Sequence, residues 1–253
     1  MSGTDTGVKT TGVTFEIVEL LSERGGATAE TLERELGLTN STVHRHLVTL
    51  RDRGYVVREA NTYRLGFRFL TLGGRRRREV TAYPAIKDKV DTLAERTDER
   101  VQFIVREGSE RIYLYTQTGA SPVQTGAYTG RRGPLHSSAA GKAILANLPE
   151  ATREDLLDGM SLDRTGPNTI TDPADLRREL SEVRERGYSV NLEESTGGVH
   201  AVGAVVTDGD DRVVGALSIS GPATRLKGER LETEIPDAVL AATNELELHI
   251  EHT

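Results

Sequence analysis

The first sixty-five residues carry three short helix patterns followed by one hairpin pattern, and this order strongly limits how the chain folds. Apolar residues at helical spacing predict the first helix: Val13, Ile17, Leu20 and Leu21. Either Thr10 or Thr11 is expected to cap this helix, and Gly25 is expected to end it. A second helix is predicted from about Thr28 to Leu36, with Gly37 placed to adopt the left-handed conformation after it.

The third helix pattern follows Thr39, a favourable capping residue, and extends to about Asp52. Its apolar edge consists of Val43, Leu47 and Leu50. Two short stretches, 55–58 and 63–65, flank a polar turn and predict a hairpin. A helix, a helix-turn-helix and a hairpin in this order predict a winged helix-turn-helix domain over residues 8–71.

Charge is distributed unevenly along the chain, which carries a formal net charge of -7. Ten of the forty-three residues from Leu36 to Arg78 are arginines, and only Asp52 and Glu59 oppose them there. Residues 1–80 carry 13 basic and 10 acidic side chains, whereas residues 81–253 carry 19 basic and 29 acidic ones. This asymmetry is typical of a domain that binds a polyanion, attached to a body that repels one.

The third helix is predicted to enter the major groove of double-stranded DNA. Arg45, opposite the apolar edge, can bond a guanine through two guanidinium nitrogens. Asn40 at the helix N-terminus suits a phosphate, and Arg58 and Arg64 lie on the wing, within reach of the DNA backbone or minor groove. The candidate DNA-binding residues are Asn40, Ser41, Thr42, His44, Arg45, Arg58 and Arg64. The alternative is that these arginines solvate an ordinary surface, but their number around a helix-turn-helix favours nucleic acid.

Two further features of the basic segment have alternative interpretations. His46 lies near the apolar edge of the third helix, and we expect it to be packed rather than to contact DNA. The run Arg75–Arg78 follows Gly73 and Gly74. These four arginines either contact phosphates beside the site or solvate a linker between two domains.

Composition excludes several classes of protein. The chain has no cysteine, so disulfides, thiolate metal sites and cysteine nucleophiles are excluded. The N-terminus lacks the apolar stretch of a signal peptide, and no run of eighteen apolar residues occurs. A cytoplasmic protein without a membrane partner is therefore expected. Lysine occurs only five times, which would suit a salt-rich cytoplasm but would equally follow from GC-rich codon usage.

Residues 72–253 are expected to form a second domain, of the α+β class. A linker helix at about 84–96 opens it, and the apolar stripe of this helix packs either against its twin in a dimer or against its own domain. Strands are expected at 101–105, 111–115, 188–193, 199–207 and 212–220. Further helices are expected at 138–146, 153–157, 173–186 and 236–249.

The chain resembles the IclR family of transcription regulators over nearly its whole length. The first domain carries "GLTNSTVHRHLVTLRDRGYV" and "YRLG", and the second carries "GPLHSSAAGKAILA", "RERGYSVNLEES" and "VVGALSISGP". The resemblance implies a winged helix-turn-helix joined by a helical linker to a GAF-like α/β effector-binding domain. It also implies a homodimer or homotetramer that binds palindromic operator DNA and senses a small organic effector, often a carboxylate. No cofactor and no metal are expected.

The resemblance also implies where the effector binds. In the family, backbone amides at the start of the "AAGKA" helix hold a carboxylate of the effector, and here these belong to Ala139 and Ala140. A helix N-terminus offers such N–H groups together with partial positive charge. The matching positions in the later motifs are Asn191, Ala201, Ser218 and Ser220.

The two serines lie two residues apart on a predicted strand, so their hydroxyls point to one face. They either form the polar floor of a pocket or bond neighbouring backbone. Some family members carry an acidic residue at the position of Asn191 and a cysteine at that of Ala201, and an apolar residue is usual at that of His46. The expected pocket is therefore less acidic and less thiol-like than theirs, and no particular effector is implied.

Sequence patterns of enzymes do not account for these motifs. "AAGKA" is not a phosphate-binding loop, because His136 stands where the first glycine of such a loop would be and Ala143 stands where a serine or threonine would be. No G-x-S-x-G motif surrounds Ser218 or Ser220. We therefore expect a regulator and not an enzyme. The alternative is a ligand-independent DNA-binding protein whose second domain only oligomerises.

Overall fold

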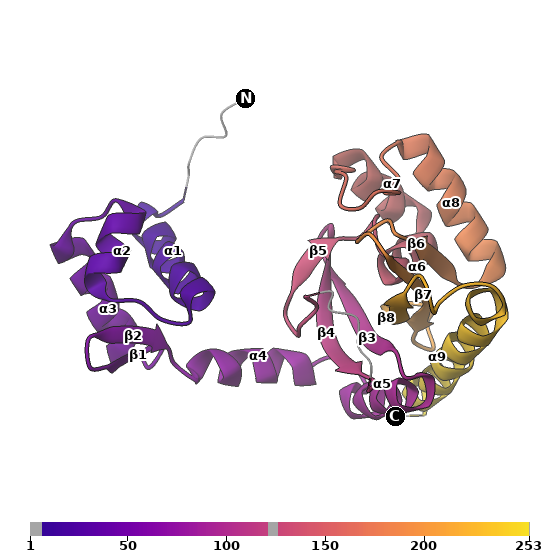
Figure 1. The fold of residues 1–253 in the computed structure, drawn as a ribbon, viewed down its shortest axis with the longest axis horizontal. Helices are drawn as coiled ribbons and strands as arrows, with labels where there is room; N and C mark the ends of the chain where they lie inside the picture. The colour runs from indigo at the N-terminus through magenta and orange to yellow at the C-terminus, as the bar shows by residue number, and fades with distance from the viewer. Residues whose placement is uncertain (1–6, 121–125, 253) are drawn as a thin grey trace. The chain divides into compact units, whose positions relative to one another are not determined.

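The computed structural model describes residues 7–120 and 126–252, and the chain divides into two compact units (Figure 1). The N-terminal unit ends at Arg78 and the C-terminal unit begins at Glu79. The boundary expected after residue 71 therefore falls inside a helix that was not predicted from the sequence, α4 (Arg68–Arg78). The four consecutive arginines form the last turn of α4, at the helix end where positive charge is favourable.

The N-terminal unit has the predicted winged helix-turn-helix order. Its other elements are α1 (Lys9–Arg24), α2 (Ala29–Leu36), α3 (Asn40–Asp52), β1 (Val56–Glu59) and β2 (Thr62–Leu65). One hydrophobic core joins the helices to the hairpin, and it includes Ile17, Leu21, Leu32, Val43, Leu47, Leu50, Val56 and Tyr63. The predicted apolar edge of α3 is thus its buried face, which leaves the opposite side of the helix exposed.

Local capping explains where α2 and α3 begin, but not where α1 begins. The side chains of Thr28 and Thr39 accept hydrogen bonds from backbone amides in the first turns of α2 and α3. The prediction that Thr10 or Thr11 caps α1 was wrong. Helix α1 begins earlier, Val8 occupies its capping position, and no side chain caps it. Both threonines are consequently helical residues in its first turn.

The C-terminal unit is built on one six-stranded sheet with the strand order β5-β4-β3-β8-β7-β6, and all neighbouring strands are antiparallel. The strands are β3 (Arg100–Glu107), β4 (Glu110–Thr118), β5 (Arg132–Pro134), β6 (Ser189–Leu192), β7 (Val199–Thr207) and β8 (Val213–Pro222). The helices are α5 (Tyr83–Thr97), α6 (Ala139–Asn147), α7 (Glu150–Gly159), α8 (Pro173–Arg186) and α9 (Ile235–Glu251), and a π-helical turn, Arg230–Glu234, precedes α9. The short strand β5 and the π-helical turn were not predicted.

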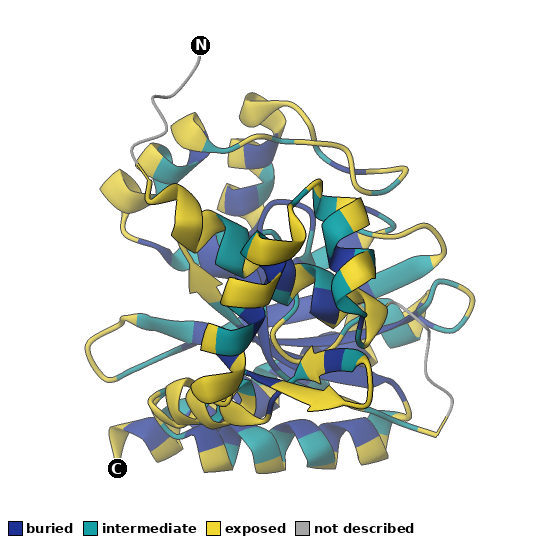
Figure 2. Cartoon of the chain, turned by 90° about the vertical axis from the view of Figure 1, so that its left-hand side faces the viewer, coloured by how far each residue is buried: buried dark blue, intermediate teal, exposed yellow. Residues whose placement is uncertain are grey.

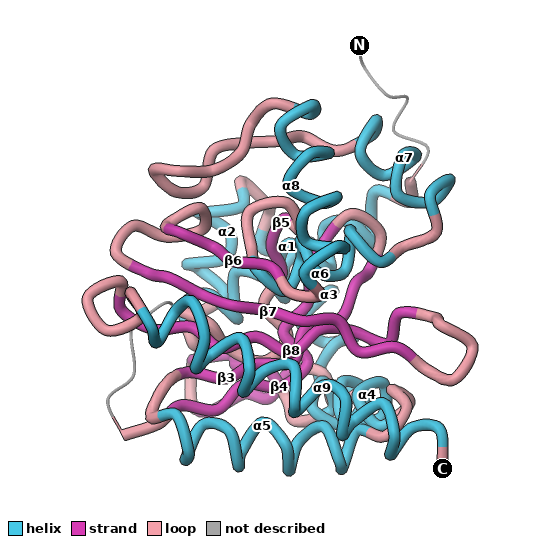
Figure 3. Tube along the Cα trace, turned by 90° about the vertical axis from the view of Figure 1, so that its right-hand side faces the viewer, coloured by secondary structure: helices cyan, strands magenta, loops and turns pink. Residues whose placement is uncertain are grey.

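Helices cover both faces of this sheet. Figure 3 shows α5 and α9 on one side and α6, α7 and α8 on the other. Each side has its own hydrophobic core. Helices α5, α8 and α9 bury the stripes that face the sheet and expose other residues (Figure 2), whereas α6 is buried along almost its whole length. This arrangement confirms the expected α+β class. No helix within the described ranges combines the length and the apolar character that crossing a bilayer requires.

Helix α5 corresponds to the predicted linker helix, and its apolar stripe packs within its own unit. Ile86, Val90 and Leu93 are almost completely buried in a core that they share with Phe103 of β3 and Val239 of α9. Of the two interpretations of this stripe, packing on the second domain is therefore the one that the structure supports. The stripe cannot at the same time cover a twin helix.

Candidate functional site

The strand register brings four of the predicted effector-binding residues onto one face of the sheet. Asn191 on β6 pairs with Ala201 on β7, and Ala201 pairs with Ser220 on β8. Ser218 lies two residues from Ser220 and pairs with Gly203 on β7. Because residues two apart on a strand share a face, these side chains all lie on the side of the sheet against which α6 packs.

The first turn of α6 lies against this face of the sheet. The Ser138 hydroxyl caps the helix by accepting a hydrogen bond from the Gly141 amide at 3.0 Å. Ser189 on β6 donates a hydrogen bond to the carbonyl of Ala139, which holds the helix start against the sheet. The amides of Ala139 and Ala140 have no acceptor within the helix, and they lie at the positive end of the helix dipole.

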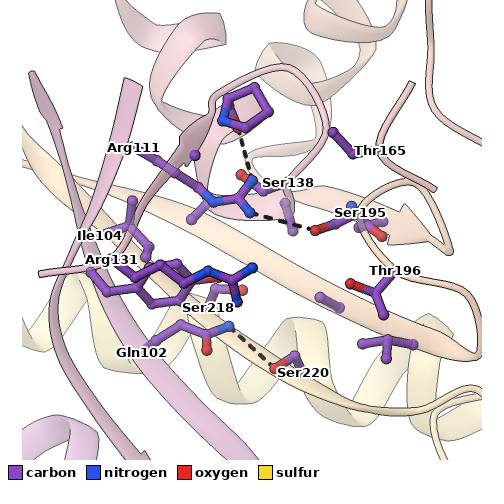
Figure 4. Close-up of a pocket in the computed structure, with 18 of the residues that line it drawn as sticks. Gln102, Ile104, Arg111, Arg131, Ser138, Thr165, Ser195, Thr196, Ser218 and Ser220 are labelled. Atoms are coloured by element: carbon purple, nitrogen blue, oxygen red, sulfur yellow. Dashed lines mark hydrogen bonds between the residues drawn. The ribbon is translucent and has the colours of Figure 1, made fainter. Parts of the chain in front are cut away.

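A cavity of about 370 Å³ lies where this helix start faces the sheet (Figure 4). All six predicted effector-binding residues line it, although they come from α6, β6, β7 and β8. Its volume lies within the usual range for sites that hold small molecules. None of the described residues that line it is an aspartate or a glutamate.

Several of these residues already use their polar atoms within the protein. The Asn191 side chain donates to the carbonyl of Ser137 at 2.7 Å and accepts from the Glu194 amide at 3.1 Å. The hydroxyl of Ser220 accepts from the Gln102 side chain at 3.2 Å. By contrast, no hydrogen bond joins the Ser218 hydroxyl to a described residue. Asn191 therefore positions the entry to α6, and Ser218 is the serine whose hydroxyl is available to a ligand.

Arg111 on β4 lines the cavity and was not predicted. Its side chain is buried, with 6% of the residue exposed. It donates to the carbonyl of Pro134 at 2.8 Å and to the Ser195 hydroxyl at 3.5 Å (Figure 4). Burial lowers the pKa of this guanidinium, its interactions with Tyr113 partly offset this effect, and the nearby charge of Arg131, which also lines the cavity, adds to the lowering.

The sequence did contain a signal for Arg111, but an ambiguous one. Arg111 and Tyr113 alternate with Ile112 on a predicted strand, so they share a face. Nothing in the sequence shows that this face is covered, because its covering residues come from distant segments. The resemblance added no help, since its motifs in the second domain lie on other elements.

A buried ion-pair network holds the segment after β6 in place beside the cavity. The ammonium group of Lys142 on α6 bonds the carboxylates of Glu194 at 2.7 Å and Glu179 at 3.0 Å, and the carbonyl of Val190 at 2.7 Å. Burial raises the pKa of Glu194, and the charge of Lys142 only partly offsets this effect. The lysine of "AAGKA" is therefore structural, and it fixes the residue that precedes Ser195.

The second candidate site is the outer face of α3. Ser41, His44 and Arg45 are exposed there, and no hydrogen bond or ion pair joins the Arg45 guanidinium to a described residue. Asn40 donates to the carboxylate of Glu33, and the Thr42 hydroxyl bonds that of Thr39, which helps to order the helix N-terminus.

The wing arginines and His46 also have partners within the N-terminal unit. Arg58 donates to the carbonyl of Ala60, and Arg64 donates to the carbonyl of Gly25 and pairs with Glu59. Both arginines therefore brace the hairpin, while their exposed surfaces remain on the wing. His46 bonds the Thr14 hydroxyl of α1 at 2.9 Å, and partial burial, followed by the charge of Arg45, lowers its pKa. This supports the interpretation of His46 as a packed side chain.

A winged helix-turn-helix followed by a separate unit with a cavity over its sheet is an arrangement typical of two-domain DNA-binding transcription regulators. Residues 10–60 match the IclR helix-turn-helix domain, and residues 80–248 match the family described as bacterial transcriptional regulator IclR C-terminal. The chain therefore belongs to the IclR family, as the sequence motifs predicted.

Individual relatives agree with this assignment. The Halobacterium salinarum protein named probable HTH-type transcriptional regulator ArcR is 34% identical over 240 residues, which are 93% of this chain and 91% of that protein. The crystal structure of the Thermotoga maritima IclR matches with a TM-score of 0.85 and 29% identity, over 96% of this chain and 98% of that one. Because the relatives are named as transcriptional regulators, this chain is a regulator and not an enzyme.

A third similar structure contains a ligand. It is an IclR homologue from Microbacterium hydrocarbonoxydans complexed with 4-hydroxybenzoate, and it matches with a TM-score of 0.80 over 96% of this chain and all of that one. At 24% identity, this likeness shows a shared fold.

Proposed function

We propose that the N-terminal unit binds double-stranded operator DNA and that a small organic acid in the C-terminal cavity modulates this binding. The observation that carries the proposal is the lining of the cavity. The amides of Ala139 and Ala140, which have no acceptor within α6, the hydroxyl of Ser218 and the guanidinium of Arg111 all line one cavity without a described acidic residue. Such a lining attracts an anion and repels none.

A carboxylate at the start of α6 would accept hydrogen bonds from the Ala139 and Ala140 amides and from the Ser218 hydroxyl. Charge-assisted hydrogen bonds of this type contribute about 1.5–3 kcal/mol each. Ala201 leaves space where a larger side chain would fill the cavity, and the relative that holds 4-hydroxybenzoate shows that this fold accommodates a small aromatic carboxylate.

On DNA, α3 would lie in the major groove, with Arg45 and His44 at base edges and Ser41, Thr42 and Asn40 at bases or phosphates. Arg58 and Arg64 would contact the backbone from the wing. A homodimer or homotetramer would engage the two halves of an operator, and this activity belongs to the cytoplasm.

The competing function is ligand-independent DNA binding with a C-terminal unit that only oligomerises. Three buried polar atoms argue against it, because they lack partners at or beside the cavity: Gln102 Oε1, Arg111 Nε and Ser137 Oγ. Buried polar groups are usually hydrogen-bonded, and leaving one without a partner costs roughly 1–3 kcal/mol. A unit that served only for oligomerisation would gain nothing from a cavity with polar atoms that lack hydrogen-bond partners.

The test uses the full chain and a panel of small organic acids. Thermal unfolding should identify acids that stabilise the protein, and an acid at 100 times its Kd should contribute roughly 2.7 kcal/mol. Operator DNA selected from a random pool should then bind with an affinity that changes when the stabilising acid is added. If no acid stabilises the protein while DNA binding is intact, the ligand-independent function is correct.

A further inference from the structure

Arg111 differs from two other buried charged groups of the C-terminal unit, Lys142 and Glu99, in how its charge is neutralised. Lys142 is paired with Glu194 and Glu179, and the buried carboxylate of Glu99 is paired with Arg225 and Arg230. Arg111, in contrast, forms no ion pair with a described residue. Lys142 and Glu99 thus have counter-charges, whereas the guanidinium of Arg111, which lines the cavity, has none among the described residues.

The neutral partners of Arg111 do not satisfy it fully. Its Nη1 and Nη2 groups bond a carbonyl and, at 3.5 Å, a hydroxyl, and its guanidinium lies 5.7 Å from the centre of the Tyr113 ring. Its Nε group is buried and has no hydrogen-bond partner. A buried charge that lacks an ionic partner is costly to the folded state. Such a group is expected where a ligand supplies the missing charge.

The cavity therefore offers two anchors for anions, on different elements. One is the N-terminus of α6, with the Ala139 and Ala140 amides, and the other is Arg111 on β4. A helix N-terminus corresponds to roughly half a positive charge, so these two anchors together carry about 1.5 positive charges, in addition to the charge of Arg131, which also lines the cavity. One carboxylate would leave part of this charge uncompensated, whereas two anionic groups would compensate it.

We propose that the effector is a small organic dianion, whose first carboxylate binds the start of α6 and whose second anionic group forms an ion pair with Arg111. This inference rests on the proposed function of the cavity and adds the number of charges on its ligand. Arg111 is then the residue that selects dianions over monoanions. Ser195, which Arg111 already contacts, would accept or donate a further hydrogen bond at the second anionic group.

The probes are the linear dicarboxylates from malonate to adipate, each compared with its own monoamide. The monoamide has nearly the same size and lacks one charge, so the comparison isolates the second anion. With the full-length protein, isothermal titration should show at least one diacid that binds about tenfold or more tightly than its monoamide, as expected for a hydrogen-bonded charge. Equal binding of diacids and monoamides by the wild type would overturn the proposal.

Arg111→Met is the decisive variant, and Arg106→Met is its matched control. Arg106 is the cross-strand partner of Arg111 but is exposed and does not line the cavity. Arg111→Met should reduce the affinity for the diacid to that for the monoamide, whereas Arg106→Met should leave both affinities unchanged. Arg111→Lys, which keeps the charge, should retain a preference for the diacid. Unchanged diacid binding by Arg111→Met would place the second anion elsewhere.

Unfolding without ligand adds an independent readout. If Arg111 is kept for a ligand, Arg111→Met should unfold at the same temperature as the wild type or higher, because an uncompensated charge is removed. A large loss of thermal stability would show instead that Arg111 is a structural residue. If monoacids bind as well as diacids and change operator affinity, the dianion inference fails while the proposed function holds. If no acid of either type binds, both fail.

Discussion

Gly203 on β7 lies against Ala140 at the first turn of α6, so closely that a Cβ atom on Gly203 would be 2.8 Å from the Ala140 backbone nitrogen. Only glycine allows the strand and the helix start to approach in this way. The close approach places the Ala140 amide at the cavity, where it is proposed to donate a hydrogen bond to a carboxylate of the effector.

Gly203→Ala should therefore displace the start of α6 and lower both stability and acid binding. Overpacking of a buried site of this kind costs about 1–3 kcal/mol. Gly159→Ala is the matched control, because a Cβ on Gly159 meets no atom within 4 Å. Urea unfolding should show a loss for Gly203→Ala and no loss for the control. If Gly203→Ala binds a stabilising acid as tightly as the wild type does, the acid does not bind at the start of α6.

The second prediction concerns the limits of the C-terminal unit. A fragment of residues 79–253 should fold, whereas a fragment of residues 98–253 should not, because it lacks α5. Burial of Ile86, Val90 and Leu93 contributes about 1.5–3 kcal/mol for each side chain, a sum comparable to the total stability of an ordinary domain. Circular dichroism of both fragments checks this, and a cooperatively folding 98–253 fragment would contradict it.

The C-terminal unit should also bind no DNA, since its sequence is acidic and it lacks α3. A gel shift with the 79–253 fragment at low salt is the most sensitive assay, because phosphate contacts are strongest there. Retained DNA affinity would disprove the assignment of DNA binding to the N-terminal unit.

Within the N-terminal unit, Arg45→Ala should weaken operator binding by roughly 1–3 kcal/mol and relax the preference for one base pair. Arg45 is exposed on α3 and has no partner among the described residues that would compete with a base. Competition binding with operator and random DNA distinguishes an arginine that contacts a base edge from one that contacts a phosphate. Arg106→Ala serves as the charge-matched control in the other unit. An equal loss on both DNAs would identify Arg45 as a phosphate contact.

Helices and strands whose bounds depend on local residue spacing were predicted more completely than the contacts between distant segments. The apolar edge of α3 and the bounds of α8 and β7 agree with the structure, because period and capping determine them. Helix α4 was missed because Gly73 and Gly74 are poor helix formers, although the helix continues through both. The apolar stripe of α5 was visible, but its partner was not, since burial depends on segments far away in the sequence.

The same distinction applies to the candidate site. Family motifs located residues on α6, β6, β7 and β8, and all six line one cavity. Arg111 and Gln102 were missed because their place depends on strand register. Gln102 reaches Ser220 only because β3 pairs with β8 across more than a hundred residues. Likewise, the sequence could not show that the side-chain amide of Asn191 forms hydrogen bonds with Ser137 and Glu194.

A pH-dependent prediction follows from Lys142 and Glu194. The pKa of Glu194 is raised in the folded state, chiefly by burial. Below its unfolded pKa of about 4.3, both states hold the proton. Above it, the unfolded state releases the proton first, so stability falls as pH rises toward the folded pKa. Glu179 and Arg186 also belong to this network, since Arg186 pairs with Glu179.

Lys142→Met removes the positive charge that partly offsets the raised pKa of Glu194. The variant should therefore be less stable than the wild type, and its stability should fall more steeply as the pH rises. Removing one partner of a buried ion pair costs about 3–5 kcal/mol. The loss should be largest at neutral pH and should shrink near pH 4, where Glu194 is protonated in both states. Urea unfolding at both pH values measures this difference. Adding Glu194→Gln to Lys142→Met should restore much of the stability at neutral pH. A loss that does not depend on pH would show that Glu194 is not responsible.

The last prediction concerns the coupling between the cavity and DNA. Ser218→Ala combined with Ser220→Ala should abolish the response to a stabilising acid while leaving acid-free operator binding intact, because both hydroxyls line the cavity and neither belongs to the N-terminal unit. Ser181→Ala, an exposed serine of α8, is the control.

Single variants should separate the two hydroxyls. Ser220→Ala also frees the Gln102 side chain and should lower stability, whereas Ser218→Ala should lower only acid affinity. Coupling between an effector and DNA is typically 1–3 kcal/mol, or about 5–150-fold in affinity, and it must be reciprocal. Operator DNA should therefore change the acid affinity of the wild type by the same factor as the acid changes DNA affinity. If the double variant responds to the acid with unchanged affinity, the effector binds outside this cavity.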